Sequence, residues 1–340
     1  MLILGIETSC DDTSAAVVED GTRVLSSVAT NQDAFHAKYG GIVPEIASRQ
    51  HVALLTAAIE DAAARADVPL ENIDGIAVTR GPGLIGSLVV GVASAKALAF
   101  ALHKPLHGIN HLHGHIFATF LDRDGDVPRY PFLTLLVSGG HSQLVEVESA
   151  TNMRVIGRTT DDAAGEAFDK SARLLGLPFP GGPEIDKLAR DGNPQAIKFP
   201  RHRAEPGSLD MSFSGIKTAV RYFIESDEGV KARKADIAAS FQAAVVDVLM
   251  QRLSAAFERK PYTGVVLSGG VAANSALQRA LRDWGKQMNV PVFIPPPKYC
   301  TDNAAMIAAA AAHQGEAVRV DPLTLSADPN LKFELPAVSS

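Results

Sequence analysis

Three histidines stand close together in NHLHGHIF, residues 110–117. His111 and His115 are four residues apart, so on a helix their imidazoles would share one face and could bind one metal ion, while His113 points elsewhere. Zinc proteases with the signature His-Glu-x-x-His need a glutamate directly after the first histidine to activate a metal-bound water. Leu112 stands there, which weakens the protease hypothesis more than the metal hypothesis. The alternative is that these histidines only make hydrogen bonds at a helix start.

A third metal ligand could lie far along the chain. Asp302 stands in KYCTDNAAMIA, residues 298–308, where an alanine-rich helix starts. An aspartate at such a position commonly caps the helix. Two histidines and one carboxylate also form a common site for iron or zinc with room left for substrate. From the residues alone, capping and metal binding both stay open for Asp302.

Glycine turns are the second group of candidate binding sites. GPGLIG, residues 81–86, has the pattern of a dinucleotide-binding loop, but no Asp or Glu for the ribose occurs between residues 75 and 121, so a dehydrogenase is not indicated. The turns SGGH at 138–141 and SGGVAAN at 268–274 suit a nucleotide phosphate better, because glycine lets backbone N–H groups approach an anion closely. Neither is followed by Gly-Lys-Ser/Thr, which excludes a P-loop kinase.

The first polar turn, ETSCDDTS at residues 7–14, carries hydroxyls and carboxylates, among them Asp11. These groups could orient a phosphate through a metal or water. A simple polar hairpin is the alternative.

Composition limits the partners and the compartment. The chain has 340 residues and a net charge of −6, so binding of a nucleic acid would need a local basic patch or a partner protein. KFPRHR, residues 198–203, is the densest basic run, and a solvated loop is its ordinary interpretation. Two distant cysteines, Cys10 and Cys300, indicate a reducing compartment.

No targeting or membrane segment is indicated. The first residues, MLILGIETSCDD, have no basic leader, and the longest apolar stretch, 88–102, contains Lys96 and is too short to cross a bilayer. We therefore expect a cytoplasmic protein without membrane contact.

The elements that would position these residues alternate strands and helices. Strands are expected at 2–7, 15–20 and 22–30, then a helix at 51–66, a strand at 73–79 and a helix from Ser87 onward. The charged Gly- and Pro-containing segment 122–131 is the best domain boundary. The second half restarts with strand-like runs at 131–140, 141–149 and 153–160, and Ser-Gly-Gly follows an apolar strand twice. Two related halves, or two turns that face one ligand, would explain this repetition.

Taken together, these residues resemble the TsaD family of tRNA N6-adenosine threonylcarbamoyltransferases, once described as O-sialoglycoprotein endopeptidases. The similarity covers nearly the whole chain and runs, in order, through LGIETSCDDT, YGGIVPEIASRQH, TRGPGLIGSL, NHLHGH, LLVSGGHSQL, DDAAGEAFDKSARLLGL, PGGP, FSGIKT, SGGVAAN and CTDNAAMIA. Each motif alone is modest, whereas the ordered set is highly specific.

The resemblance implies an α/β fold of the actin, Hsp70 and sugar-kinase (ribonuclease H-like) type. Two similar domains, each with a mixed five-stranded sheet, would close on a nucleotide in a cleft between them. The first domain would comprise residues 1–130, with a helix at about 303–325 returning to it, and the second residues 131–302.

The same resemblance implies the site residues. His111, His115 and Asp302 would bind one divalent metal ion, with Fe²⁺ favoured over Zn²⁺. The adenylate part of the substrate would be bound by nine residues of the second domain: Leu136, Val137, Ser138, Gly139, Gly140, Asp169, Gly182, Asp186 and Asn274. Asp11 is our candidate for the catalytic base or amine-orienting group.

The implied reaction is acyl transfer. Threonylcarbamoyl-AMP would give its threonylcarbamoyl group to N6 of the adenosine beside the anticodon, position 37, in tRNAs that read ANN codons. A TsaB-like paralogue and a TsaE-like ATPase would be heteromeric partners. The alternatives are a small-molecule kinase or ATPase of the same fold, a metallopeptidase and a non-catalytic scaffold, of which the kinase would bind ATP but has no evident use for the two histidines.

Overall fold

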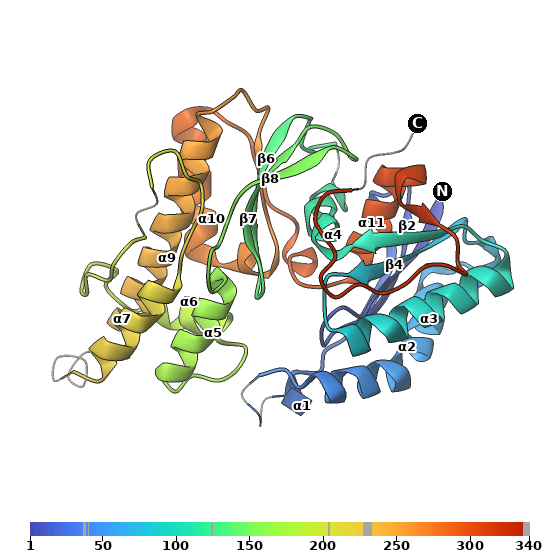
Figure 1. Ribbon diagram of the computed structural model, residues 1–340, viewed down its shortest axis with the longest axis horizontal. Helices are drawn as coiled ribbons and strands as arrows, with labels where there is room; N and C mark the ends of the chain where they lie inside the picture. The colour runs from blue at the N-terminus through green and yellow to red at the C-terminus, as the bar shows by residue number, and fades with distance from the viewer. Residues whose placement is uncertain (37–38, 40, 124, 203–204, 227–232, 336–340) are drawn as a thin grey trace. The chain divides into compact units, whose positions relative to one another are not determined.

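The computed structural model describes residues 1–335 except 37–38, 40, 124, 203–204 and 227–232. The chain divides into two compact units (Figure 1). Unit 1 comprises residues 1–128, 148–153 and 295–340, and unit 2 comprises residues 129–147 and 154–294. The domain limits expected from the sequence, 1–130 and 131–302, stay a prediction.

Unit 1 is built on a mixed sheet in which β1, β4 and β5 run parallel, while β2, β3 and β11 are antiparallel to their neighbours. The strand order is β11-β5-β4-β1-β2-β3. The strands are β1 (Leu2–Glu7), β2 (Thr13–Glu19), β3 (Arg23–Thr30), β4 (Gly75–Gly81), β5 (Leu106–Asn110) and β11 (Arg319–Val320). The implied sheet of five strands is therefore wrong for unit 1, because the two-residue β11 adds a sixth strand beside β5.

Helices cover both faces of this sheet. Leu4 and Ile6 of β1 belong to a buried core shared with α2 (Pro44–Ala66) and α3 (Ile85–Leu102). The residue between them, Gly5, faces the other way, where a Cβ would meet the backbone of α11 (Ala304–Gln314). This alternation is that of a strand buried on both faces. Gly5 therefore permits the close approach of the helix that follows Asp302.

Two helices of unit 1 differ from expectation. The helix expected at 51–66 begins seven residues earlier, at Pro44, which stands in the first turn where proline is tolerated. The helix expected at about 303–325 ends at Gln314, because Gly315 has φ 52° and leaves the helical conformation.

α3 is longer and more apolar than the sequence analysis expected. It has 18 residues with a mean hydropathy of 1.9, so by length and composition it could cross a bilayer, and the expectation that this stretch is too short was wrong. Its Val92, Ala95 and Ala99 lie in the core of unit 1, and 33% of the helix is buried.

Unit 2 repeats the order of the first five strands of unit 1. Its sheet has the order β10-β9-β6-β7-β8, with β6 and β7 antiparallel and with β9 parallel to both β6 and β10. The strands are β6 (Phe132–Val137), β7 (Ser142–Val147), β8 (Met153–Arg158), β9 (Val265–Ser268) and β10 (Val292–Phe293). The repeated order supports the prediction of two related halves.

The remaining helices complete both units. Those of unit 2 are α5 (Ala164–Leu174), α6 (Gly181–Ala189), α7 (Ser214–Ile224), α9 (Lys234–Phe257), α10 (Ser275–Met288) and the 3₁₀ helix η4 (Gly270–Ala273). Those of unit 1 are α1 (Asp33–His36), α4 (His111–Phe117), η2 (Leu70–Asn72), η3 (Ala118–Phe120), η5 (Pro297–Tyr299) and η6 (Gly315–Val318).

Candidate metal centre and glycine turns

α4 starts directly after β5, and an asparagine caps it. The Asn110 side chain accepts a hydrogen bond of 2.9 Å from the Leu112 backbone N–H. The histidines are therefore not needed to cap this helix. His113 points away from the other two, as predicted: its Nε2 lies 2.6 Å from the Phe333 carbonyl and its Nδ1 3.0 Å from the Gln314 amide nitrogen. Burial lowers the pKa of His113 to about 4, so it serves the packing of α4 as a neutral side chain.

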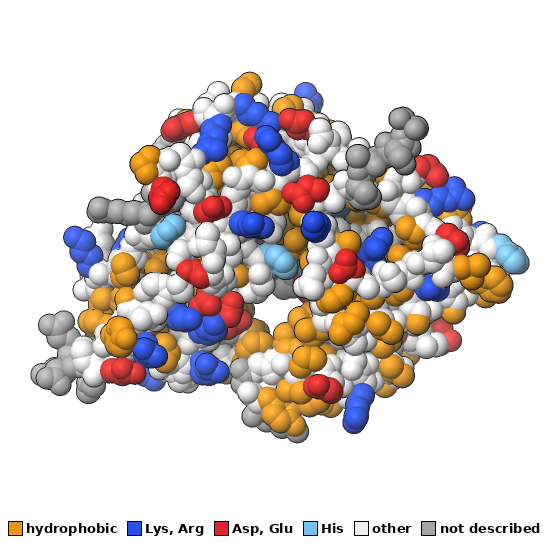
Figure 2. Space-filling view, viewed as in Figure 1, with side chains coloured by type: hydrophobic (Ala, Val, Ile, Leu, Met, Phe, Trp, Pro, Cys, Tyr) orange, Lys and Arg blue, Asp and Glu red, His pale blue; other side chains and the backbone are white. Residues whose placement is uncertain are grey.

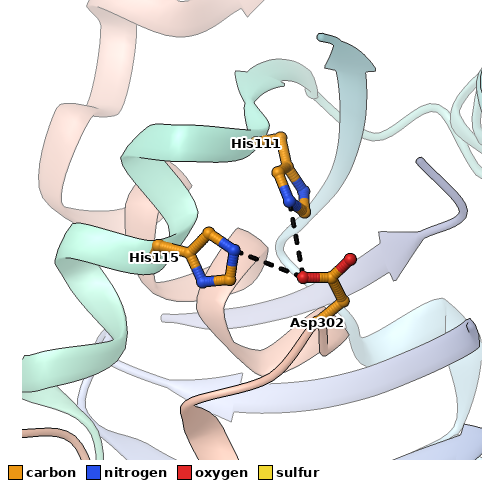
Figure 3. A group of neighbouring side chains, drawn as sticks. All are labelled: His111, His115 and Asp302. Carbon is orange, nitrogen blue, oxygen red and sulfur yellow. Dashed lines mark ion pairs between the residues drawn. The ribbon is translucent and has the colours of Figure 1, made fainter. Parts of the chain in front are cut away.

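Asp302 is also free of the capping role. Asn303 is the N-cap of α11, and its side chain accepts a hydrogen bond of 2.9 Å from the Met306 N–H. The Asp302 carboxylate points instead at the two histidines (Figure 3). Its Oδ1 lies 3.4 Å from His111 Nε2 and 3.2 Å from His115 Nε2. Residues nearly 190 positions apart thus form one His-His-Asp group, with ligand atoms within 4.8 Å of one another.

A second carboxylate, Glu7, contacts His111 at the ring nitrogen that does not face Asp302. His111 Nδ1 lies 3.1 Å from Glu7 Oε2 and 3.1 Å from Ser9 Oγ. Glu7 also accepts hydrogen bonds from the Ser9 N–H at 2.5 Å and from Thr79 Oγ1 at 2.6 Å. A carboxylate on the far nitrogen of a ligand histidine sets its tautomer and ring orientation in many metal sites. The sequence analysis gave Glu7 no role, although a single carboxylate at the end of an apolar strand is a usable signal.

The electrostatics of this group favour a bound positive charge. Burial disfavours the charged form of His111, but the attraction of Asp302 and Glu7 outweighs burial and holds the imidazole pKa well above its usual value. Burial would raise the pKa of Asp302, yet His111 and then His115 hold it well below its usual value. Burial would also raise the pKa of Glu7, but the attraction of His111 outweighs burial and lowers this pKa. Glu7 is buried and Asp302 half-buried, so these two carboxylates need a compensating cation, which a proton or a metal ion can supply.

The side chains fit a metal ion. Two ligand atoms at tetrahedral angles around one Zn²⁺ or Fe²⁺ are about 3.4 Å apart, which is close to both Asp302–histidine distances. Among the described residues, neither ring nitrogen of the buried His115 has a hydrogen-bond partner, and only the ion-pair contact of its Nε2 with Asp302 offsets this. A buried imidazole with an unsatisfied nitrogen beside a carboxylate suits metal coordination.

Asp11 lies in the turn between β1 and β2, half-buried. Burial raises the pKa of the Cys10 thiol, and the nearby negative charge of Asp11 raises it further. The place of Asp11 at the carboxyl end of β1 is compatible with a role near the metal group. The role itself stays a prediction.

In unit 2, the two Ser-Gly-Gly turns lie side by side. Leu136 of β6 pairs with Ser268 of β9, so both turns leave the same edge of the sheet. A Cβ at Gly269 would meet the Val137 carbonyl oxygen at 2.4 Å, and one at Gly165 would meet the Ser138 carbonyl oxygen at 2.5 Å. These two glycines therefore permit close packing of backbone. Around Gly139 and Gly140, by contrast, a Cβ would find no heavy atom within 4 Å.

The other expected substrate residues lie at, or bond to, the starts of α6 and α10. Asp169 Oδ1 accepts hydrogen bonds from the backbone N–H groups of Gly181, at 2.8 Å, and Gly182, at 3.3 Å. Burial is the main cause that raises the pKa of this carboxyl. Asp169, on α5, thus bonds to the first two backbone N–H groups of α6.

Asp186 and Asn274 meet at the start of α10. Asp186 Oδ1 accepts hydrogen bonds from the Ser275 hydroxyl at 2.8 Å and from its N–H at 3.2 Å. Asn274 caps α10 through the Leu277 N–H and donates to Gln242 Oε1 at 2.7 Å. The nine expected adenylate residues thus lie on β6, on its turn, and on or bonded to the starts of α6 and α10 in unit 2.

Comparison of the sequence with known proteins identifies the family of this chain. The sequence matches the family described as TsaD, tRNA N6-adenosine threonylcarbamoyltransferase, over residues 23–309. The enzyme of that name from Moorella thermoacetica is 53% identical over 331 residues, which are 97% of this chain and 96% of the relative. The chain belongs to the TsaD family. The enzyme of the same name from Symbiobacterium thermophilum is 51% identical, over 97% of this chain and 96% of its own. The protein is thus a tRNA-modifying acyltransferase, as its sequence predicted.

Solved structures with low sequence identity show the fold. HypF from T. kodakarensis aligns with a TM-score of 0.60 at 14% identity, over 91% of this chain and 47% of HypF. The (R)-2-hydroxyglutaryl-CoA dehydratase component A from Acidaminococcus fermentans aligns with a TM-score of 0.53 at 16% identity, over 92% and 98%. Their fold is that of the actin, Hsp70 and sugar-kinase group, so the predicted fold class is confirmed.

Proposed function

We propose that this TsaD-family enzyme takes the threonylcarbamoyl group from threonylcarbamoyl-AMP and places it on N6 of adenosine 37 in tRNAs that read ANN codons. The exocyclic amine attacks the carbamoyl carbon, the bond from that carbon to the phosphate oxygen breaks, AMP leaves, and N6 loses a proton. The observation that carries the proposal is the His-His-Asp group, with both histidines buried, in a chain of this family. No metallopeptidase, kinase or scaffold role is needed to account for it.

His111, His115 and Asp302 are proposed to bind one divalent metal ion, Fe²⁺ in preference to Zn²⁺, because two histidines and a carboxylate are typical of both. The bound ion would supply Lewis-acid stabilisation of developing negative charge. The chain's own contribution is orientation: Glu7 and Ser9 hold the His111 ring by its Nδ1. An adenine amine is a weak nucleophile, so such positioning must supply much of the rate.

The adenylate is proposed to bind at the glycine turns of unit 2. Backbone N–H groups at Gly139 and Gly140 would face its phosphate. Ser138, whose N–H donates to the His141 carbonyl at 2.7 Å, would fix the shape of this turn. Asp169 uses Oδ1 for both backbone hydrogen bonds, and no described residue donates to its Oδ2, which could accept from a ribose hydroxyl. Leu136, Val137, Gly182, Asp186 and Asn274 would complete the binding site.

Gly140→Ala tests the adenylate site. Gly140 has neither a positive φ nor a neighbour within 4 Å of a Cβ, so the protein should fold and melt like wild type. A methyl group on the phosphate-binding turn should nevertheless raise the KM for threonylcarbamoyl-AMP by about tenfold, the cost of roughly 1.4 kcal/mol of lost binding. Gly215→Ala is the matched control, because a Cβ there is equally unobstructed and lies on α7. An unchanged KM in Gly140→Ala would contradict the site.

Asp11 is proposed to orient the attacking amine or accept its proton. Asp11→Asn keeps the shape of the side chain and removes the charge, so kcat should fall by about 100-fold, the lower part of the range for a general base. Binding of tRNA, measured by fluorescence anisotropy, should not change. Full turnover with unchanged binding would show that Asp11 has neither role.

A heteromeric partner is proposed for the helical face of unit 1. Val52 on α2 and Ile85 and Val89 on α3 are 68%, 51% and 50% exposed. A Cβ at Gly86 would lie 3.3 Å from the Ser48 Cβ, so these turns of α2 and α3 are adjacent. Figure 2 shows hydrophobic side chains gathered over these helices. An exposed apolar face suits a stable protein partner. We propose a TsaB-like paralogue here, with a TsaE-like ATPase as the further component, in the cytoplasm.

The decisive experiment is reconstitution. The purified chain is incubated with threonylcarbamoyl-AMP and an unmodified tRNA, with and without a chelator, and AMP release and nucleoside mass are followed. Modified adenosine that disappears with chelator supports the reaction and its metal together. If no product forms even with both partner proteins, the reaction is wrong, and ATP with a panel of metabolites would test the kinase alternative. Failure to co-elute with a TsaB-like protein would contradict the proposed partner.

A further inference from the structure

Four basic side chains surround a hollow on unit 2 that the proposed reaction does not use. Lys170 and Arg173 project from α5, and Lys217 and Arg221 from α7. Each pair is spaced so that its members lie on one helix face. The hollow, which we call the α5–α7 basic pocket, has a volume of about 230 Å³ and is also lined by Leu174 and Thr218. Figure 2 shows Lys and Arg side chains gathered over these helices.

The two lysines are held in place by acidic groups. Lys170 lies 3.2 Å from Asp162 and 2.6 Å from Glu166, and Lys217 forms an ion pair with Asp162. Burial would raise the pKa of Asp162, but hydrogen bonds from Lys217 and Lys170 hold it below its usual value, so it stays ionised. Four cations line the pocket, and Asp162 and Glu166 pair only with its two lysines, so the side of the two arginines is positive.

The two arginines are available to a ligand. Both are exposed, and neither forms an ion pair with any described residue. The Arg221 guanidinium lies 4.9 Å from the centre of the Tyr222 ring, and that ring is 61% exposed. An exposed aromatic ring under an arginine is an arrangement that stacks on nucleic-acid bases.

The size and chemistry of the pocket favour a phosphate group. A volume of about 230 Å³ is below the range of about 300–1,000 Å³ for pockets that enclose a whole small molecule. Arginine matches phosphate oxygens with two parallel hydrogen bonds. The chain as a whole carries a net charge of −6, so this positive region is a local feature and not part of a general basic surface.

The densest basic run of the sequence is a weaker candidate. Within residues 198–203, Arg201 bonds to Asp247 through two nitrogens, at 3.0 and 2.8 Å, and to the Phe199 carbonyl at 2.6 Å. Its guanidinium is therefore already engaged. The lysines on α5 and α7 are also paired, but the two arginines beside them form no ion pair with the part of the chain that the structure describes.

We propose that the α5–α7 basic pocket binds a backbone phosphate of the tRNA substrate, with Arg173 and Arg221 as its principal contacts and Tyr222 against a neighbouring base. The proposal rests on the tRNA-modifying function of the chain. It assigns a substrate-docking surface on unit 2 in addition to the adenylate site.

The test is the double variant Arg173→Ala/Arg221→Ala in the full chain. Binding of an unmodified tRNA transcript is measured by fluorescence anisotropy at several salt concentrations. We expect Kd to rise about tenfold and the slope of log K against log salt to fall by roughly 1.4 to 1.8, the value for two lost phosphate contacts. The KM for tRNA should rise while kcat at saturating tRNA is unchanged, because neither side chain takes part in the reaction.

Arg282→Ala/Lys286→Ala on α10 is the matched control, because it removes two exposed positive charges from the same unit. It should leave Kd and the salt slope close to wild type. Arg173→Lys/Arg221→Lys should restore the slope but only part of the affinity, which separates charge from bidentate geometry.

Either of two results would overturn the proposal: unchanged Kd and slope in the alanine variant, or an equal loss in the α10 control. The assay reads binding without turnover, so it is independent of the reaction. A wild-type chain that binds tRNA but makes no product would refute the proposed reaction and leave the docking surface intact.

Discussion

His115→Ala is expected to abolish metal binding and to lower turnover by more than about 100-fold. Loss of a ligand should exceed the roughly 10- to 100-fold cost of removing an outer partner of a metal site. His115 is a cleaner choice than His111, because among the described residues its ring nitrogens have only one polar contact, with Asp302. Removing His111 would also leave the buried Glu7 carboxylate without its histidine, which costs stability. Metal content per chain by mass spectrometry and threonylcarbamoyl transfer to tRNA are the two measurements.

The control for His115→Ala is His103→Asn. His103 is exposed, follows α3 and has φ 52°, a conformation that asparagine tolerates. It should keep one metal ion per chain and full activity. A His115→Ala protein that retains both the metal and the activity would show that the His-His-Asp group is a buried ion-pair cluster and not a metal site.

Gly5→Ala is expected to lower the stability of the protein by about 3 kcal/mol, the upper part of the range for overpacking. A Cβ at Gly5 would lie 2.1 Å from the Ala304 carbonyl oxygen and 3.1 Å from the Ala308 Cβ. Backbone of α11 cannot yield as a flexible side chain can, so the helix start must shift. Asp302 stands two residues before Ala304, and metal affinity should therefore fall together with stability. Urea denaturation and metal content of the same preparations measure both effects.

Gly139→Ala is the matched control for this substitution, because a Cβ there has no neighbour within 4 Å. Its free energy of unfolding should stay within about 0.5 kcal/mol of wild type. If Gly5→Ala unfolds at the wild-type urea concentration, the close approach of α11 to β1 is not required for folding.

Local spacing in the sequence determined the histidine pair and the repeated turns. His111 and His115 share a helix face because they are four residues apart, whatever the rest of the chain does. Ser-Gly-Gly after an apolar strand likewise predicts a turn wherever that strand lies. The resemblance to the TsaD family then added the fold and the function, and the comparisons confirmed both.

The tertiary structure alone decided the roles of neighbouring residues. Asp302 and Asn303 are both good helix caps by type, and only the position of α4 beside α11 shows that Asn303 caps while Asp302 faces the histidines. Besides the local Ser9 N–H, Glu7 acquires Thr79 and His111 as partners from segments more than 70 residues away. Such partners are set by long-range packing, which leaves no periodic signal in the sequence.

The glycines and the basic residues show the same division. Gly269 serves close backbone packing, whereas Gly139 and Gly140 face open space, and the Ser-Gly-Gly motif treats all three alike. The run at 198–203 stands out in the sequence, but its Arg201 is tied to Asp247. The α5–α7 basic pocket is invisible in the sequence, because its cations come from two helices about 45 residues apart and converge only when both pack in unit 2. Sequence spacing thus sets the direction of a side chain along its own element, and tertiary packing sets its neighbours.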